Sequence, residues 1–438
     1  MRFLLLLLTL PVAVGAAEPT AAERGRKALL EVSYLPPAWR QVAYENVWKQ
    51  WKDTAQKPAD YETAIRDRYG LHPAPYPNDG LPMGLRKATF LLIKGVSIDC
   101  MLCHGGSIMG KSYVGLGNAS LEIQALFEEM SGSDGRPART PFRFGNVRGT
   151  SEAGGMAVYL LGYRNPDLSM HSPRQELGLH DDMCEDVPAW WHLKKKKTMY
   201  YTGGADAHSV RSKMQFMMTP VTTRGEFDRH EPAFKDIDAY LRTIEAPKYP
   251  FSIDAEKAAV GRKLFTDNCA SCHGTYGETS AYPNKIIPLD EIGTDSKRYD
   301  GISAEFAAFY DRSWFADEKP VGHKSLPSKG YQAPPLDGLW ATAPYLHNGS
   351  VPTVAGVLNS KARPAVFTRS YKTEEADYDS KNLGWKYREV KPDPKLSAIE
   401  QRKIYNTRDP GRGNAGHTFG DHFTDDERAA VIEYLKTL

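Results

Sequence analysis

Two copies of the pattern Cys-x-x-Cys-His constrain this chain more than any other feature of its sequence. The first reads CMLCH at residues 100–104 and the second reads CASCH at residues 269–273, and together they use four of the five cysteines. Two thiols three positions apart can form thioethers to the two vinyl groups of a haem, and the adjacent histidine can then bind the iron. The pattern therefore predicts two covalently bound c-type haems, haem 1 and haem 2. The predicted attachment residues and iron ligands are Cys100, Cys103 and His104 for haem 1, and Cys269, Cys272 and His273 for haem 2.

Three other uses of the paired cysteines fit the sequence less well. A four-thiolate zinc site leaves both motif histidines unexplained and normally has its two pairs much closer in sequence. A thioredoxin-like pair needs a strand before the motif, whereas the residues before the second copy look helical. Disulfides suit an exported protein, but two tight pairs and a leftover Cys184 make a poor framework. Cys184 is expected to be a small buried thiol, because Glu185 and Asp186 beside it disfavour a thiolate.

The first residues, MRFLLLLLTLPVAVGAAE, have the features of an export signal. Arg2 is followed by an apolar run and a small-residue cleavage site, which predicts a signal peptide over residues 1–17. That run is too short to span a bilayer, and no later stretch approaches ~20 apolar residues. We therefore expect a periplasmic or secreted protein with no transmembrane segment after signal removal, a retained N-terminal anchor being the alternative. A net charge of +2 gives no support for nucleic-acid binding.

The remaining pattern predicts a mostly α-helical fold with two cytochrome c-like haem domains, long ordered loops and little β structure. Thr424 and Glu427 form a capping box at the start of the last predicted helix. A linker at 245–254 divides the chain into an N-terminal domain, 18–247, with haem 1 and a C-terminal domain, 248–438, with haem 2. Helices are expected within 21–35, within 38–52, from 234 to a stop at Pro247, from 254 into the second motif, and over 424–438.

The second axial position of each iron separates electron transfer from catalysis. A histidine or methionine there gives a closed redox centre, whereas an open face can bind peroxide or dioxygen. The first histidine after His104 is His171, so no nearby histidine can close haem 1. We expect haem 1 to be open, although three methionines could reach it: Met109, Met156 and Met170.

Two histidines are candidates for the second axial ligand of haem 2. His417 lies in GNAGHTFGDHF, just before the last predicted helix, among glycines that let a loop approach a flat cofactor. His347 lies in APYLHNGSVPT, a second turn-rich segment. His417 is preferred and His347 is the alternative. A lone histidine in a loop is otherwise usually a surface residue.

Three longer sequence segments resemble those of the bacterial di-haem cytochrome c peroxidase superfamily, and within it those of the rubber-oxygenase-like branch. They are KGYQAPPLDGLWATAPYLHNGSVPT, YPNKIIPLDEIGTD and GNAGHTFGDHFTDDERAAVIEYLKTL. The resemblance implies a reactive haem 1 and a haem 2 that stores or relays electrons. Peroxidases of this superfamily carry a distal histidine shortly after the first motif, which this chain lacks. In the rubber-oxygenase-like branch haem 1 has no protein distal ligand and haem 2 has two histidines, which matches this pattern better. Because the chain is shorter than rubber oxygenases, their polymer substrate is not carried over.

The predicted function is haem-dependent electron transfer, with peroxidase- or oxygenase-type chemistry at haem 1 and relay by haem 2. The expected partners are a small redox substrate, peroxide or dioxygen, and a redox protein. The alternative is a non-catalytic periplasmic electron carrier with both haems six-coordinate. Trp190 and Trp191 are the candidate catalytic residues, because aromatic side chains between redox centres can relay electrons; each alone also fits a core anchor. Trp340 is a further aromatic candidate beside haem 2.

Several polar residues have weaker assignments. Arg143 and Arg148 could hold haem propionates. The lysines at 194–197 could dock an acidic partner or pair with propionates, although a solvated charged face is the favoured reading. The resemblance also implies calcium between the haem domains, for which Asn284, Asp290 and Asp295 offer oxygen ligands.

Overall fold

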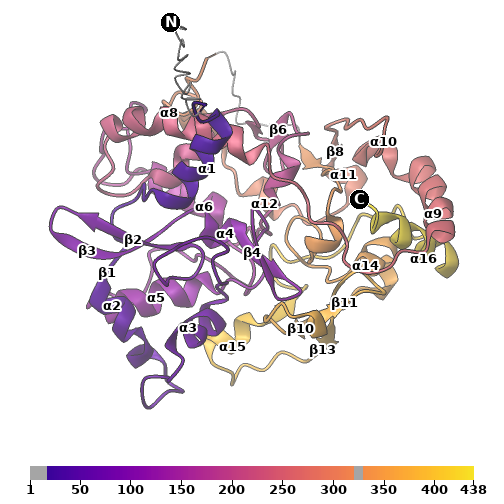
Figure 1. The fold of residues 1–438 in the computed structure, drawn as a ribbon, viewed down its shortest axis with the longest axis horizontal. Coiled ribbons are helices and arrows are strands. Elements are labelled where there is room, and N and C mark those ends of the chain that lie inside the picture. The colour runs from indigo at the N-terminus through magenta and orange to yellow at the C-terminus, as the bar shows by residue number, and fades with distance from the viewer. Residues whose placement is uncertain (1–16, 320–328) are drawn as a thin grey trace, which may run out of the picture.

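The computed structural model describes residues 17–319 and 329–438, so the predicted signal peptide lies outside it except for its last residue. Helices joined by long loops and small antiparallel sheets make up the fold (Figure 1). The predicted mostly α-helical class with little β structure is confirmed. Within the described residues no helix is long and apolar enough to cross a membrane.

The helices and strands are short, and most lie close to a motif or a turn. The α-helices are α1 (Ala21–Glu31), α2 (Gln41–Asn46), α3 (Tyr61–Tyr69), α4 (Met101–His104), α5 (Ile123–Ser133), α6 (Ala153–Leu161), α7 (Val210–Met214), α8 (Arg224–Leu241), α9 (Ala255–Asn268), α10 (Ala270–His273), α11 (Leu289–Ile292), α12 (Lys297–Asp300), α13 (Ala304–Tyr310), α14 (Val354–Leu358), α15 (Ala398–Arg402) and α16 (Asp425–Leu435). The strands are β1 (Trp39–Arg40), β2 (Leu85–Phe90), β3 (Ile93–Ile98), β4 (Gly105–Ile108), β5 (Lys111–Val114), β6 (Thr198–Met199), β7 (Ala205–Asp206), β8 (Ile286–Pro288), β9 (Gly330–Gln332), β10 (Val366–Arg369), β11 (Tyr378–Asp379), β12 (Gly384–Trp385), β13 (Tyr387–Glu389) and β14 (Ile404–Asn406). Two sheets have three strands, in the orders β1-β3-β2 and β13-β10-β14, and the others are hairpin pairs or strand pairs.

The predicted helices are present, with two corrections. The segment 38–52 is helical only in part, because Trp39 and Arg40 pair with β3 before α2 begins. The helix expected to stop at Pro247 ends at Leu241 instead. Beyond it, Ile244 packs against the two largest hydrophobic clusters at once, where the chain is no longer helical.

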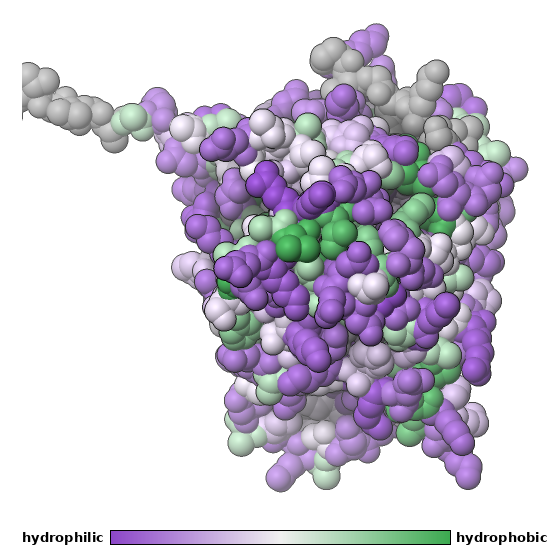
Figure 2. Space-filling view, turned by 90° about the vertical axis from the view of Figure 1, so that its right-hand side faces the viewer, coloured by the Kyte–Doolittle hydropathy of each residue, from purple (hydrophilic) through white to green (hydrophobic). Residues whose placement is uncertain are grey.

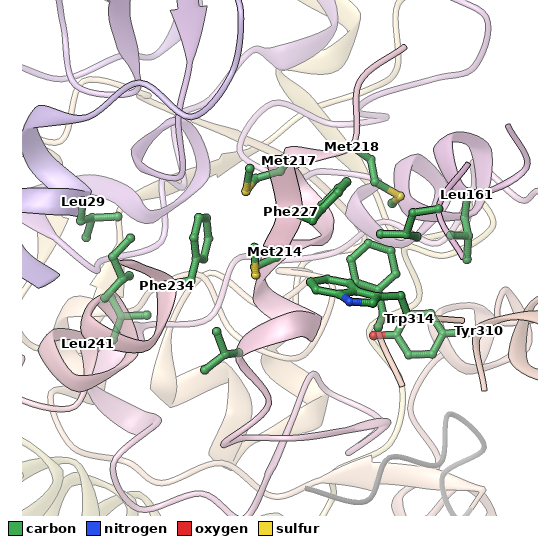
Figure 3. Packing of buried hydrophobic residues seen from close by; sticks show 14 of the residues in the cluster. Leu29, Leu161, Met214, Met217, Met218, Phe227, Phe234, Leu241, Tyr310 and Trp314 are labelled. Atoms are coloured by element: carbon green, nitrogen blue, oxygen red, sulfur yellow. The ribbon is translucent and has the colours of Figure 1, made fainter. Parts of the chain in front are cut away.

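The first large cluster fills the space between α1, α6, α7 and α8 (Figure 3). Leu29, Leu161 and Phe227 contribute side chains to it from the N-terminal half of the chain. Residues 304–315 enter the same cluster from the other side of the predicted boundary at 247, through residues such as Trp314. The core of the N-terminal half therefore includes side chains from beyond residue 300. The two-domain division itself stays a prediction.

The second large cluster lies under α9 and α16, at the right of Figure 1. Gly261 of α9 lies so close to α16 that a Cβ on it would stand 1.8 Å from the Ala430 carbonyl oxygen. The two helices that flank the second motif can approach this closely only because that side chain is absent. Figure 2 shows the outer face on this side as largely hydrophilic, with a small hydrophobic patch near its middle.

Candidate haem sites

The first motif occupies a single helical turn that follows strand β3. The His104 N–H donates to the Cys100 carbonyl at 3.0 Å, which places Cys103 and His104 on α4 and Cys100 at its N-cap. Asp99 starts this turn by accepting from the Met101 N–H at 2.8 Å. Arg86 of β2 pairs with the same carboxylate at 2.8 Å, so the hairpin β2–β3 anchors the motif.

The thiols of this motif lie deep in the protein yet keep some accessible surface, as side chains that line internal space do. Burial, with the neighbouring Asp99 carboxylate, raises the pKa of Cys100 to about 12. Burial and Glu185 raise the pKa of Cys103 to about 12. Both thiols are therefore neutral in the folded chain, and thioether formation to a haem would place no charge at these buried positions.

The rival uses of the cysteines find no support in the structure. All five cysteines are free thiols, so no disulfide forms within either motif. Within the described residues no three histidine, cysteine or acidic side chains come together as a metal site, and the four-thiolate zinc site is therefore wrong. Cys184 is fully buried, as expected, and burial raises its pKa to about 12.

The imidazole of His104 stacks on the indole of Trp190, with ring centroids 4.6 Å apart and planes inclined by 22°. Burial lowers the pKa of His104 to about 4, so the ring is neutral, as an iron ligand must be. The turn bearing the motif thus presents a neutral, oriented imidazole that fits a proximal haem ligand.

The second motif continues directly from helix α9 into the single turn α10. Its histidine is oriented by the backbone, because His273 Nδ1 donates to the Pro334 carbonyl at 2.9 Å. This hydrogen bond places the proton on Nδ1 and leaves Nε2 free to bind a metal, a common arrangement for ligating histidines. Burial, with the nearby His273, lowers the pKa of His417 to about 4, so that ring is neutral too.

The ring of His417 lies opposite that of His273, with centroids 6.2 Å apart and planes inclined by 56°. Imidazole nitrogens bind first-row metals at about 2 Å, so two rings that share one ion have centroids roughly 6 Å apart. The loop that carries His417 is fixed by Arg363, which donates to the carbonyls of Gly416 at 2.7 Å and His417 at 3.0 Å. The residues present therefore fit a haem held between two histidines.

His347, the alternative ligand, makes its ring contacts elsewhere. Its imidazole stacks on Tyr331, with centroids 4.2 Å apart, and meets Tyr201 edge-on. Its carbonyl accepts the Asp186 N–H at 2.8 Å, which ties the HNGS turn to the N-terminal half. Its buried Nε2 has no hydrogen-bond partner. The structure thus separates the two candidates by position and brings only His417 to His273.

The two tryptophans, adjacent in sequence, belong to different clusters. Trp190 contacts His104 and the first cluster, whereas Trp191 belongs to the second, against which Cys269 packs. The Trp191 indole donates to the Asp337 carbonyl at 2.8 Å. One residue earlier, the Leu336 N–H donates at 2.7 Å to a tyrosine hydroxyl, that of Tyr276. That hydroxyl in turn donates to the His273 carbonyl at 3.0 Å. Ring contact, hydrogen bonds and two stretches of backbone, 190–191 and 336–337, therefore link the first motif histidine to the second.

The remaining predicted residues are placed as follows. Trp340 lies in the second cluster, against which Cys269 also packs, and its indole donates to the Pro247 carbonyl. Met109 and Met156 are partly buried, and Met170 is 50% exposed at the surface. No ring of another described histidine stands opposite His104.

The arginines predicted to hold propionates, and Asn284 of the predicted calcium ligands, have other partners. Arg148 donates to the carbonyls of Ser120 and Asp67, so its guanidinium is already used. Arg143 is exposed and donates to Asn146. Asn284 accepts the backbone N–H groups of Lys197 and Thr198, and the described residues supply no cluster of carboxylates that supports calcium.

The lysine run is not one solvated face. Lys194 pairs with Glu245 and Lys195 with Asp337. Lys196 is partly exposed, and burial lowers its pKa to about 8. The expected solvated face is therefore not uniform, because exposure differs from one lysine to the next and two of the four are ion-paired.

The sequence did not reveal one polar cluster near the first motif. Glu185 pairs with Arg298 at 2.9 Å, both groups being nearly inaccessible to solvent. Tyr201 donates to the Asp186 carboxylate at 3.3 Å. In the sequence, the adjacent acidic residues Glu185 and Asp186 after Cys184 were the indication of this polar cluster. Nothing in the sequence pointed to Tyr201 or Arg298 as their partners.

Comparisons with known proteins give matches over parts of this chain. The family described as cytochrome c matches residues 258–322, which contain the second motif. The family described as RoxA-like, cytochrome c-like matches residues 330–368. These matches, with the two sites, support a c-type cytochrome with covalently bound haem iron that takes part in electron transfer. The finer placement in the di-haem peroxidase superfamily stays a prediction.

Two curated relatives are uncharacterized proteins of Sinorhizobium fredii (strain NBRC 101917 / NGR234). The chain is 31% identical to y4iM over 296 residues, which are 58% of this chain and 64% of the relative. It is 29% identical to y4iJ over 263 residues, which are 44% of this chain and 41% of the relative. The chain thus spans less than two thirds of the length of either.

One solved structure also matches, that of hydrazine synthase from Kuenenia stuttgartiensis pressurised with xenon. The alignment covers 68% of this chain and 89% of that chain, at 13% identity and a TM-score of 0.24. A likeness this low carries no argument about function.

Proposed function

We propose that this chain is an exported di-haem c-type cytochrome with oxidoreductase activity of the peroxidase or oxygenase type. Bound haem supplies reversible one-electron chemistry and, where an axial face is open, a binding position for peroxide or dioxygen. In this proposal the haem on the first motif is the reactive one and the haem on the second relays electrons.

The observation that supports this proposal is the asymmetry between the two motif histidines. His273 has His417 opposite it at 6.2 Å between ring centroids. His104 has an indole on one side and, within the described residues, no second histidine ring. A closed site suits electron relay, and an open site suits reaction with a small oxidant.

The protein residues have distinct roles in this proposal. The hydrogen bond from His273 to Pro334 holds the ligand ring, and the stack on Trp190 orients His104. Trp190 and Trp191 span the distance between the two sites as an aromatic relay. An exported redox protein would donate or accept electrons at the haem 2 side.

Absorption and electron paramagnetic resonance spectra of the purified protein, with and without carbon monoxide, test the proposal. We expect one high-spin and one low-spin iron, with carbon monoxide binding to the reduced high-spin centre. Two low-spin irons that bind no carbon monoxide would instead establish the alternative, a non-catalytic electron carrier.

A further inference from the structure

The hairpin β2–β3 ends in four consecutive hydrophobic residues that project into solvent. Leu91 is 83% exposed and Leu92 is 97% exposed. Phe90 and Ile93, which pair across the strands beside them, are 39% and 52% exposed. The hairpin extends outward at the left edge of Figure 1. Large apolar side chains gathered at a protruding tip mark a contact surface rather than scattered surface residues.

The turn chemistry makes this arrangement more unusual. Two-residue hairpin turns favour Asn, Asp or Gly, because their backbone needs positive φ. Here the turn is Leu91-Leu92, and Leu91 has a φ of 53°, in the left-handed region that leucine rarely adopts. A polar or glycine turn would form more readily, so backbone preference does not explain the two leucines.

The charges beside the tip point to one kind of partner. Lys87 and Lys94 are exposed, and the register places them on the same face of the hairpin, opposite the face of Phe90 and Ile93. No acidic residue occurs between positions 80 and 98. An apolar tip next to lysines matches an anionic lipid surface, where the leucines enter the headgroup layer and the ammonium groups meet lipid phosphates.

The size of the tip favours lipid over a protein partner. A stable protein interface takes about 800 Å² and some 20–30 residues from each side. Four residues on a slender hairpin fall far short of that, but they suffice for weak, reversible membrane contact. We propose that the β2–β3 tip inserts into the surface of an anionic bilayer and holds this chain at a membrane. The proposal is independent of the reaction proposed above.

The test is vesicle sedimentation of the full holoprotein. Vesicles of phosphatidylcholine mixed with phosphatidylglycerol are compared with pure phosphatidylcholine. The key variant is Leu91→Gly with Leu92→Asn, which removes the apolar tip and gives the turn residues that a positive φ favours, so the hairpin is preserved. A matched control is Val221→Ser, at a valine 50% exposed on another surface. All proteins share one N-terminus, so differences between them report on the hairpin.

We expect the unaltered protein to prefer the anionic vesicles and the tip variant to bind about tenfold or more weakly. The Val221 control should bind unchanged, and Lys87→Gln with Lys94→Gln should abolish the preference for anionic lipid. Absence of vesicle binding, or equal binding by the tip variant, overturns the proposal. A concentration-dependent dimer that the tip variant loses, without vesicle binding, would assign the tip to a second copy and also overturns it.

Discussion

His273 and His417 face each other with ring centroids 6.2 Å apart, although one belongs to the attachment motif and the other to a loop near the C-terminus. Replacing His417 with alanine removes the second imidazole without touching the covalent attachment site. We expect the haem 2 iron to change from low spin to high spin, because a strong axial ligand is lost. Electron paramagnetic resonance of the oxidised protein measures this change.

His347→Ala is the matched control for that experiment. Its ring stacks on Tyr331, away from His273, so the spin state of haem 2 should stay as it is. If the His417 variant remains low spin and the His347 variant does not, the assignment of the two histidines is reversed.

The tryptophan pair predicts a second effect, on the rate of electron exchange between the haems. Trp191→Phe replaces the indole, which donates to the Asp337 carbonyl, with a smaller aromatic ring that has no N–H group. Trp190→Phe weakens the stack on His104. Each change should slow exchange by about tenfold or more, measured by stopped-flow or flash photolysis, while haem content stays constant. Trp385→Phe is the control, since Trp385 packs in the same cluster as Trp191 but its indole donates to the Ala343 carbonyl instead. Equal slowing by all three variants would argue against a specific path.

Replacing Gly338 with alanine should lower the stability of the fold through two separable effects, a backbone cost and overpacking. Gly338 has a φ of 63°, and an added Cβ would lie 2.7 Å from the Ala246 Cβ and 3.3 Å from the Trp191 ring. Gly135 has a φ of 73° with nothing within 4 Å of such a Cβ. Both alanine variants incur the backbone cost of about 1 kcal/mol, but only Gly338→Ala adds overpacking of about 1–3 kcal/mol. Urea unfolding measures the loss in free energy of unfolding for each variant. Equal losses in the two variants would show that the loop beside Trp191 moves to accommodate the added methyl group at no extra cost.

Stability should fall with rising pH because of Glu152. Burial, with the nearby Glu185, raises the pKa of Glu152 from its ordinary 4.5 to about 8. Between these values the folded protein keeps a proton that the unfolded chain has lost, so stability present at low pH is lost as pH rises towards 8, by at most about 1.4 kcal/mol per pH unit. Glu152→Gln carries no such proton, so its stability relative to the unaltered protein should rise over that range. Parallel curves in denaturant titrations at pH 5 to 8 would mean that Glu152 is ionised throughout.

Local signals in the sequence predicted the helices that flank the second motif. Thr424 and Glu427 do form the reciprocal hydrogen bonds of a capping box, and α16 begins at the next residue after Thr424. Asp254 caps α9, which leads into the motif as expected. Such caps depend on residues three apart, so a sequence read in short windows contains the information.

Contacts between segments that are far apart in the sequence could not be predicted from such local patterns. The pairing of His347 with Tyr331 and the entry of Trp314 into the first cluster depend on where distant segments meet. The β2–β3 hairpin was missed for a different reason, because Leu91-Leu92 lacks the residues that announce a turn. His417 was already preferred over His347 from the sequence, but the contacts of Ile292 and Arg363 that hold its loop join distant segments and had no local signal.

The packing of residues 304–315 into the N-terminal core has a consequence for how the protein matures. A chain that emerges from its N-terminus exposes CMLCH first, then CASCH, and only afterwards the aromatic segment that includes Trp314. The cluster against which Cys100 packs is complete only when that segment has arrived. The first core can therefore close only after both attachment motifs have emerged, so the thiols of Cys100 and Cys103 stay outside a finished core until residues beyond 300 arrive.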